Sequence, residues 1–218
     1  MTSVIGILSL ILALTATSSA LSCTKCSSTS SRCSGNSITC PSGSVCGSAY
    51  TQSFVEGVRT KNLIRGCTPS SDCNFSGTMS ITKGRIEVGI SCCRTDDCTP
   101  SLPTLPTKSS KPNGVMCPSC ISDQSTWCYT SDTIQCTGDE NRCFLQATEI
   151  TGLLSTAMRG CATKSICDLP SKSYNTGGST IKFTYNCTSG GISAHKVVLT
   201  PAILCLLLLK LFLCNVVC

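Results

Sequence analysis

The chain has 218 residues, of which 21 are cysteine, 5% are aromatic and 13% are charged. So few aromatic residues exclude a large apolar core, and this density of cysteine is typical of a disulfide-stapled protein from an oxidising compartment. The formal net charge of +6 comes from scattered basic residues without a run, which argues against a nucleic-acid-binding face.

Residues 1–20 have the features of a secretory signal peptide. An apolar run covers residues 4–14, and the small residues Ser18 and Ala20 fit the pattern that precedes a cleavage site. No Lys or Arg precedes the run, which departs from that pattern, but the run is too short to span a membrane comfortably. We expect the mature chain to begin at Leu21.

Two groups of cysteines follow, the first in residues 21–98 and the second in residues 117–189. Residues 99–116 separate them and hold four prolines among serines and threonines. This composition predicts an extended, semi-rigid linker, and it also invites O-glycosylation.

The two groups are repeats of one unit. Each opens with a C-x-x-C pair, and each carries an Arg-Gly-Cys tripeptide with five residues between its cysteine and the next. The tripeptide ends at Cys67 in the first group and at Cys161 in the second. Equal spacing around the same tripeptide indicates a duplication.

Between the cysteines, β-prone segments alternate with glycine-bearing turns, which predicts hairpins. The turns are expected at Glu56-Gly57, Lys83-Gly84 and Thr151-Gly152, and the pattern around Thr151 also permits a helix. The expected strands are residues 45–51, 60–64, 79–81 and 86–88 in the first module and residues 144–148 and 153–158 in the second.

Residues 190–218 have the features of a glycosylphosphatidylinositol (GPI) attachment signal. Ser189 and Gly190 are small, a short polar spacer follows, and residues 197–218 are mostly apolar. A transmembrane helix is the alternative, although Lys210 inside it would be costly in lipid. We expect the anchor at Ser189 or Gly190. Three cysteines then leave with the tail, and an even number, eighteen, remains.

The first module resembles the lymphocyte-antigen-6/urokinase-receptor superfamily of three-finger domains. The matching features are the opening Cys23 and Cys26, the Gly66-Cys67 pair, and the closing Cys92-Cys93 with Cys98. The resemblance implies an all-β, disulfide-rich fold of two tandem three-finger domains. The family usually places Asn after its last cysteine, where this chain has Thr99.

The resemblance also implies how the cysteines pair. The second module lacks the vicinal cysteine and the last bridge. The tandem arrangement is most similar to the gamma-type inhibitors of phospholipase A2 and to related GPI-anchored proteins with two domains. The implied bridges are Cys23–Cys46, Cys26–Cys33, Cys40–Cys67, Cys73–Cys92, Cys93–Cys98, Cys117–Cys143, Cys120–Cys128, Cys136–Cys161 and Cys167–Cys187.

Catalytic and metal chemistry are not expected. Paired C-x-x-C motifs can hold zinc, but the secretory context and the even number of cysteines favour disulfides, so we expect no metal and no cofactor. The single histidine, His195, lies in the tail expected to be lost, which leaves no imidazole to activate a nucleophile. Asp96-Asp97 and Asp139-Glu140 are more typical of solvated turns than of catalytic pairs. We therefore expect that the protein is not an enzyme.

Glycosylation sites and finger tips are the expected surface features. The sequons at Asn74 and Asn186 should be exposed. Hairpins stapled at one end leave their tips free to carry recognition, and Trp127 and Tyr129 are the strongest anchors by residue type. Packing against the disulfides is the alternative for Trp127 and Tyr50. The predicted partner-binding residues are Tyr50, Phe54, Val55, Arg59, Lys61, Trp127, Tyr129, Leu153 and Leu154.

The leading hypothesis is therefore a non-enzymatic, GPI-anchored recognition protein on the outer surface of the plasma membrane. It would bind an extracellular protein, such as a receptor or ligand, through its finger loops. The alternatives are an inhibitor of secreted phospholipase A2 and a freely secreted, pheromone-like signalling protein.

Overall fold

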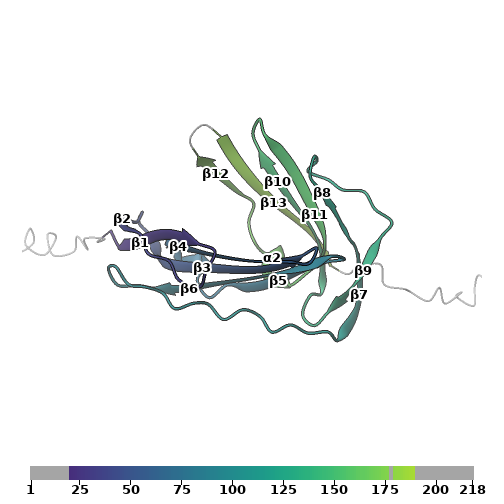
Figure 1. Ribbon diagram of the computed structural model, residues 1–218, viewed down its shortest axis with the longest axis horizontal. Helices are drawn as coiled ribbons and strands as arrows, with labels where there is room; N and C mark the ends of the chain where they lie inside the picture. The colour runs from purple at the N-terminus through teal and green to yellow at the C-terminus, as the bar shows by residue number, and fades with distance from the viewer. Residues whose placement is uncertain (1–19, 177–178, 190–218) are drawn as a thin grey trace, which may run out of the picture.

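The computed structural model describes residues 20–176 and 179–189 (Figure 1). Nearly all regular structure in these residues is β-strand, which confirms the predicted disulfide-rich fold of two tandem three-finger domains. The first module consists of three hairpins. They are β1 (Ser22–Ser28) with β2 (Asn36–Thr39), β3 (Ser44–Val55) with β4 (Val58–Pro69), and β5 (Ser76–Ile81) with β6 (Gly84–Cys93).

The second module repeats this plan with a less regular first finger. A one-turn helix follows the middle hairpin in both modules, η1 (Ser70–Asp72) in the first and α2 (Lys164–Cys167) in the second. The short strand β8 (Cys120–Ser122) lies against β11. The paired strands are β7 (Pro112–Pro118) with β9 (Thr133–Thr137), β10 (Arg142–Ile150) with β11 (Leu154–Ala162), and β12 (Lys172–Thr176) with β13 (Ser179–Ser189).

The turn of the β3–β4 hairpin lies at Glu56-Gly57, as predicted. Both residues have positive φ, 51° and 86°, which is the backbone of the two-residue turn that matches strand twist. The prediction for the β5–β6 hairpin was wrong by one residue, because Ile81 pairs with Gly84 and the turn is Thr82-Lys83. A Cβ on Gly84 would lie 2.3 Å from the carbonyl oxygen of Phe54. Glycine is therefore needed here for the close approach of β6 to β3, and not for the turn.

Within the described residues, nine disulfides hold the hairpins, and their pairing is the one that the family resemblance implies. Their Cα–Cα distances run from 5.2 to 6.2 Å, within the normal range. At the base of each module the bridged cysteines themselves form a buried cluster. The disulfides therefore replace much of the apolar core that the composition does not supply.

The two modules share one continuous sheet. Its strands run in the order β12-β13-β10-β11-β5-β6-β3-β4-β1-β2, and the modules meet where Ala162 of β11 pairs with Met79 of β5. The backbone N–H of Thr82 donates to the hydroxyl of Ser119, at 2.8 Å, so the tip of the third finger touches the base of the second module. Figure 1 shows the two sets of hairpins spreading apart from this joint.

An apolar cluster fills the joint. Met79 and Ile81 of the first module pack with Phe144, Ala162 and Ile166 of the second, and each of these five side chains is buried. Since this cluster draws on both modules, neither module can complete it alone. The joint therefore fixes the modules relative to each other.

The segment between the modules is packed against the first module. Pro100 and Pro103 are buried, and the Cβ of Pro103 lies 2.9 Å from the place where a side chain on Gly89 of β6 would begin. The guanidinium of Arg65 donates to the carbonyl of Pro100 at 3.4 Å. Figure 1 shows the segment running beside β6 toward β7, which begins at Pro112. Of the expected linker, residues 112–116 therefore belong to β7, and the part before them has no regular structure and packs against the first module.

Glu140 is the largest departure from expectation, because it is buried and not in a solvated turn. Only 1% of the residue is exposed. Its Oε1 accepts hydrogen bonds from Thr78, Ser80 and Arg85 of the first module, at 2.8, 2.9 and 2.9 Å. Three donors of one module therefore hold one carboxylate of the other. Its neighbour Asp139 is exposed, as expected.

Replacing Arg85 by Ala should loosen the joint, because the buried carboxylate of Glu140 would lose the cation that is bonded to it. We expect the free energy of unfolding to fall by about 3 kcal/mol, measured by denaturant unfolding with the disulfides intact. The matched control is Lys83→Ala, which removes the exposed Lys83–Glu56 pair and should cost at most about 1 kcal/mol. Equal losses in the two variants would contradict this account of the joint.

Candidate protein-binding surfaces

Trp127, Tyr129 and Arg159 form an exposed cluster on the second module, here called the aromatic patch. Trp127 and Tyr129 are 43% and 91% exposed, and their ring centroids lie 6.0 Å apart. The guanidinium carbon of Arg159 lies 5.0 Å from the centroid of the Trp127 ring, a cation–π contact. Trp127 therefore does not pack into the core, and the patch presents the residue types that dominate binding interfaces.

A disulfide and a repeated arginine hold the loop that carries this patch. Cys128, between the two aromatic residues, is bonded to Cys120, and its carbonyl accepts a hydrogen bond from Arg159 at 3.4 Å. In the first module, Arg65 makes the same 3.4 Å contact with the carbonyl of Cys33. The arginine of the repeated tripeptide thus ties the first finger to the second in both modules. The sequence pattern identified the repeat but not this role.

The middle finger of the first module carries a second exposed surface. Phe54 is 47% exposed, and the guanidinium carbon of Arg59 lies 5.7 Å from its ring centroid. Lys61 is exposed on the same strand, whereas Val55 is half-buried against the cluster at the joint. Val58, which was not among the predicted binding residues, is 62% exposed at the turn.

Tyr50 was wrongly predicted as a binding residue, because only 3% of it is exposed. It lies in β3, which is paired on both sides, and it stands between Leu63 of β4 and Gly89 of β6. Its hydroxyl accepts a hydrogen bond from the Gln52 amide at 3.0 Å. Tyr50 is part of the core because its position is central in the sheet and not at a tip.

Leu153 and Leu154 lie at the tip of the β10–β11 hairpin, as predicted, and are 77% and 46% exposed. They line a shallow hollow of about 500 Å³ together with Asp123 and Gln124 of the first finger. The first two fingers of the second module therefore lie side by side at this hollow.

A larger cavity of about 680 Å³ lies between the modules. Phe75, Val88 and Ile90 line it from the first module, and Phe183 and Tyr185 are among the residues that line it from the second. Burial, and then the neighbouring Tyr174, raise the pKa of the Tyr185 hydroxyl above its ordinary value of 10.0. This volume is in the range of small-molecule sites.

An ion pair between Asp72 and Lys172 lies at the border of this cavity and joins the two modules at 2.6 Å. The hydrogen bond from Lys172 lowers the pKa of the Asp72 carboxyl below its ordinary value of 3.8, and it outweighs the opposing effect of burial. The two residues are 100 positions apart, and no pattern in the sequence indicated their contact.

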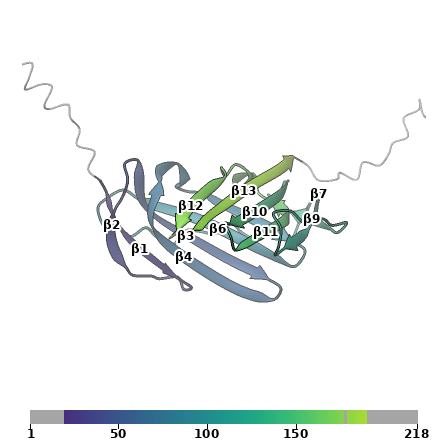
Figure 2. The ribbon, with the colours of Figure 1, turned by 90° about the horizontal axis from the view of Figure 1, so that it is seen from above.

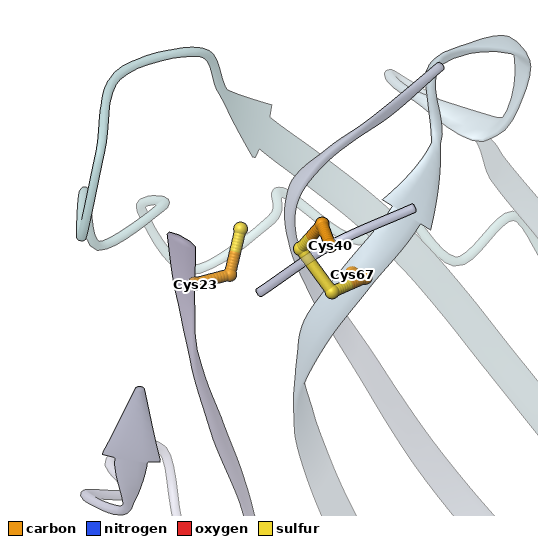
Figure 3. A group of neighbouring side chains, drawn as sticks. All are labelled: Cys23, Cys40 and Cys67. Atoms are coloured by element: carbon orange, nitrogen blue, oxygen red, sulfur yellow. A yellow bond between two sulfur atoms is a disulfide. The ribbon is translucent and has the colours of Figure 1, made fainter. Parts of the chain in front are cut away.

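In each of two groups of three cysteines, the sulfur atoms lie within 4.8 Å of one another, which is close enough for a shared metal ion. They are Cys23 with Cys40 and Cys67, and Cys117 with Cys136 and Cys161. Figure 3 shows Cys40 and Cys67 joined to each other, with Cys23 beside them. Cys23 is bonded to Cys46, and the second group is bridged in the same way. Metal ligation needs a thiolate, and a bridged cysteine has none. The sulfurs lie close together because two disulfides cross in each group.

The adjacent acidic residues of the first module have a structural role. Asp96 Oδ1 accepts a hydrogen bond from the backbone N–H of Ser22 at 2.8 Å, and the N–H of Asp97 donates to the carbonyl of Ser22 at 2.8 Å. The Ser37 hydroxyl donates to the Asp97 carboxylate. These contacts return the end of the module to its first hairpin.

Both sequon asparagines are exposed. Asn74 has a φ of 60°, and Asn186 lies in β13 beside Cys187, which is bonded to Cys167. Ser189 is exposed at the end of β13, whereas residues 1–19 of the expected signal peptide, Gly190 and the expected tail lie outside the described residues. Within the described ranges, no helix has the length and apolar character needed to cross a membrane.

Comparison with known proteins places these features in a family. The u-PAR/Ly-6 domain matches this sequence twice, over residues 19–101 and 113–195. The chain belongs to the u-PAR/Ly-6 domain family. The family resemblance stated from the cysteine pattern is therefore confirmed.

Three relatives are similar to this chain. The phospholipase A2 inhibitor 25 kDa subunit of Naja kaouthia is 30% identical over 148 residues, covering 66% of this chain and 80% of the relative. The phospholipase A2 inhibitor NAI of Notechis ater is 28% identical over 148 residues, covering 66% and 74%. The urokinase plasminogen activator surface receptor of Rattus norvegicus is 32% identical over 120 residues, covering 53% of this chain and 35% of the receptor.

The Asp72–Lys172 pair predicts a pH dependence of stability. A carboxyl whose pKa is lowered by folding stabilises the fold above its unfolded pKa, and this contribution is lost as the pH falls through the folded pKa. Asp72→Asn should therefore lower the unfolding free energy by about 1 kcal/mol at pH 7, and the difference should begin to shrink near pH 3.8 and vanish below the lowered pKa of the folded state. Thermal unfolding of both proteins at pH 7 and at a pH well below 3.8 measures this difference in stability.

The control for this test is Asp123→Asn, since Asp123 is exposed and forms no ion pair with any described residue. It should change stability little at either pH. A loss in Asp72→Asn that is the same at both pH values would contradict the role of the ion pair.

Proposed function

We propose that this chain is a non-enzymatic extracellular recognition protein that binds a protein partner through its finger loops. The aromatic patch carries the proposal. Trp127 and Tyr129 are exposed. The contacts of Arg159 with the Trp127 ring and the Cys128 carbonyl, together with the Cys120–Cys128 bridge, position Trp127 and its loop before any partner arrives. Preorganised aromatic anchors lose little conformational freedom on binding, so most of their contact energy remains available for affinity.

The acidic pairs support a non-enzymatic role. Glu140 is held by three donors at the joint, and Asp96 and Asp97 bond to the first hairpin. The two described ranges contain no histidine, since His195 lies beyond them. Relatives that are named as inhibitors and as a surface receptor are consistent with a protein that acts by binding.

Secreted phospholipase A2 is the partner class favoured by a specific observation. Two of the relatives described above are named as phospholipase A2 inhibitors, and the similarity to each extends over 148 residues. This partner class belongs in any binding test, both as a ligand and in an assay of phospholipase activity. No binding and no inhibition at micromolar protein would eliminate phospholipases as partners.

Replacing both Trp127 and Tyr129 by Ala should weaken partner binding by at least about a hundredfold, because two anchor side chains are removed. The full-length protein displayed on cells would be stained with labelled extracellular proteins, secreted phospholipases among them. The control variant is Tyr174→Ala, which removes an aromatic side chain of similar exposure, 49%, from the third finger. Equal binding by the double variant and the control would refute the role of the patch.

We further propose a GPI anchor at Ser189 or Gly190, supported by the small residues, the polar spacer and the apolar tail. Ser189 is exposed at the end of β13, where an attached lipid would not disturb the sheet. A phosphatidylinositol-specific phospholipase should release the protein from intact cells, detected with an antibody against the first module. Retention at the surface would indicate a transmembrane segment, and protein found only in the medium would indicate a freely secreted signal.

A further inference from the structure

The outer edge of β4 is unpaired near its tip. β4 pairs with β3 from Val58 to Pro69, but β1 covers its other side only at Leu63, Ile64 and Arg65. No backbone hydrogen bond from another described segment reaches residues 58–62 on that side. Figure 2 shows this part of the β3–β4 finger extending beyond β1. Five residues of strand therefore present a free edge.

The register indicates which backbone groups are free. In a two-residue hairpin the residues that flank the turn, here Val55 and Val58, form the first hydrogen-bonded pair. Hydrogen-bonded and non-bonded positions then alternate along the strand. The N–H and C=O groups of Arg59 and Lys61 consequently point away from β3, and they are available to another strand.

The two faces of the strand at this edge carry different kinds of side chain. Arg59 lies on one face over the Phe54 ring, and Lys61 shares that face because strand side chains alternate. Both are exposed, and neither forms an ion pair with a described residue. Val58 and Thr60 lie on the other face, where the hydroxyl of Thr60 is hydrogen-bonded to Ser53 at 2.5 Å. The edge thus has a cationic face and a mostly uncharged face.

These charges decide which strand can pair there. A second copy pairing through the same edge in antiparallel orientation would bring Arg59 and Lys61 opposite the same residues, and directly opposed like charges destabilise a sheet. Lysine on an edge strand is a known device against such self-association. A segment with acidic residues at alternate positions would instead place each carboxylate beside a cation. Charge complementarity therefore favours an acidic strand over a second copy.

We infer that the free edge of β4 binds an extended segment of a partner protein, with acidic side chains at alternate positions facing Arg59 and Lys61. Main-chain hydrogen bonds to these two residues would supply affinity, and the side-chain pattern would supply selectivity. The inference rests on the proposed binding function and names the chemistry of the partner at the first module. In the proposed function the aromatic patch would contact the partner separately, from the second module.

Amide hydrogen exchange tests the free edge directly. In the full-length protein the amides of Arg59 and Lys61 should exchange faster than those of Thr60 and Asn62, which bond to β3. The probe is a synthetic peptide that alternates valine with glutamate, and the control peptide alternates valine with lysine. The glutamate peptide should slow exchange at Arg59 and Lys61 at least about tenfold, and the lysine peptide should leave it unchanged.

Two variants distinguish the contribution of side-chain charge from that of backbone hydrogen bonding. The double variant Arg59→Glu with Lys61→Glu should weaken binding of the glutamate peptide at least about tenfold. Lys61→Pro removes an outward N–H that β3 does not use, and it should weaken binding as well. Lys108→Glu, at an exposed lysine of the linker, is the control and should bind as the unaltered protein does. Protection of the Thr60 and Asn62 amides shows that each variant keeps the β3–β4 hairpin.

The outcomes distinguish this inference from the proposed function. Failure of the glutamate peptide to bind, equal binding of both peptides, or binding without protection of Arg59 and Lys61 would each overturn the inference. A natural partner that needs Trp127 and Tyr129 but binds the doubly charge-reversed variant normally would overturn it too, while leaving the recognition function intact. A natural partner that loses affinity in both sets of variants would support both.

Discussion

Two disulfides cross at the base of each module and join its hairpins covalently there, in addition to the strand pairing that runs along the hairpins. In the first module Cys23–Cys46 lies beside Cys40–Cys67, and in the second Cys117–Cys143 lies beside Cys136–Cys161. Such bridges stabilise by restricting the unfolded chain, each by about 2–4 kcal/mol. A chain with few aromatic residues can therefore hold long hairpins whose far ends need no core of their own.

The joint between the modules uses some of those free ends. The third finger of the first module contributes β5 to the shared sheet, and its tip contacts Ser119 of the second module. The apolar cluster and the Glu140 carboxylate fix this arrangement from either side. That finger is consequently unavailable to a partner. In the proposed function, the partner is bound by the middle finger of the first module and by the first two fingers of the second.

The two remaining surfaces offer different chemistry. The aromatic patch is a compact anchor whose rings are held by a cation–π contact and a neighbouring bridge. The edge of β4 is extended and cationic, and it offers backbone groups as well as side chains. Because the joint holds the modules together, one partner could engage both surfaces without ordering a hinge. A bivalent contact of this kind gains affinity from the fixed spacing.

The sequence by itself determined the two modules and the turn of the β3–β4 hairpin, and the family resemblance supplied the pairing of the cysteines. Each of these depends on local spacing: the repeated Arg-Gly-Cys, the Glu56-Gly57 turn, and a cysteine order specific enough to indicate the family. Exposure at the tips followed for Phe54, Trp127 and Leu153, since a residue near a hairpin turn has few neighbours.

Only the tertiary structure decided what lies between the modules. Glu140 meets Thr78 across 62 positions and Lys172 meets Asp72 across 100, and no local period records such contacts. From its sequence position, an acidic residue beside a turn is expected to be solvated. Glu140 is buried because the other module supplies its hydrogen-bond donors. Likewise, Tyr50 is expected near a tip until β4 and β6 enclose it. The physical reason is that burial of a side chain depends on which distant strands pack over it, and spacing along the chain does not carry that information.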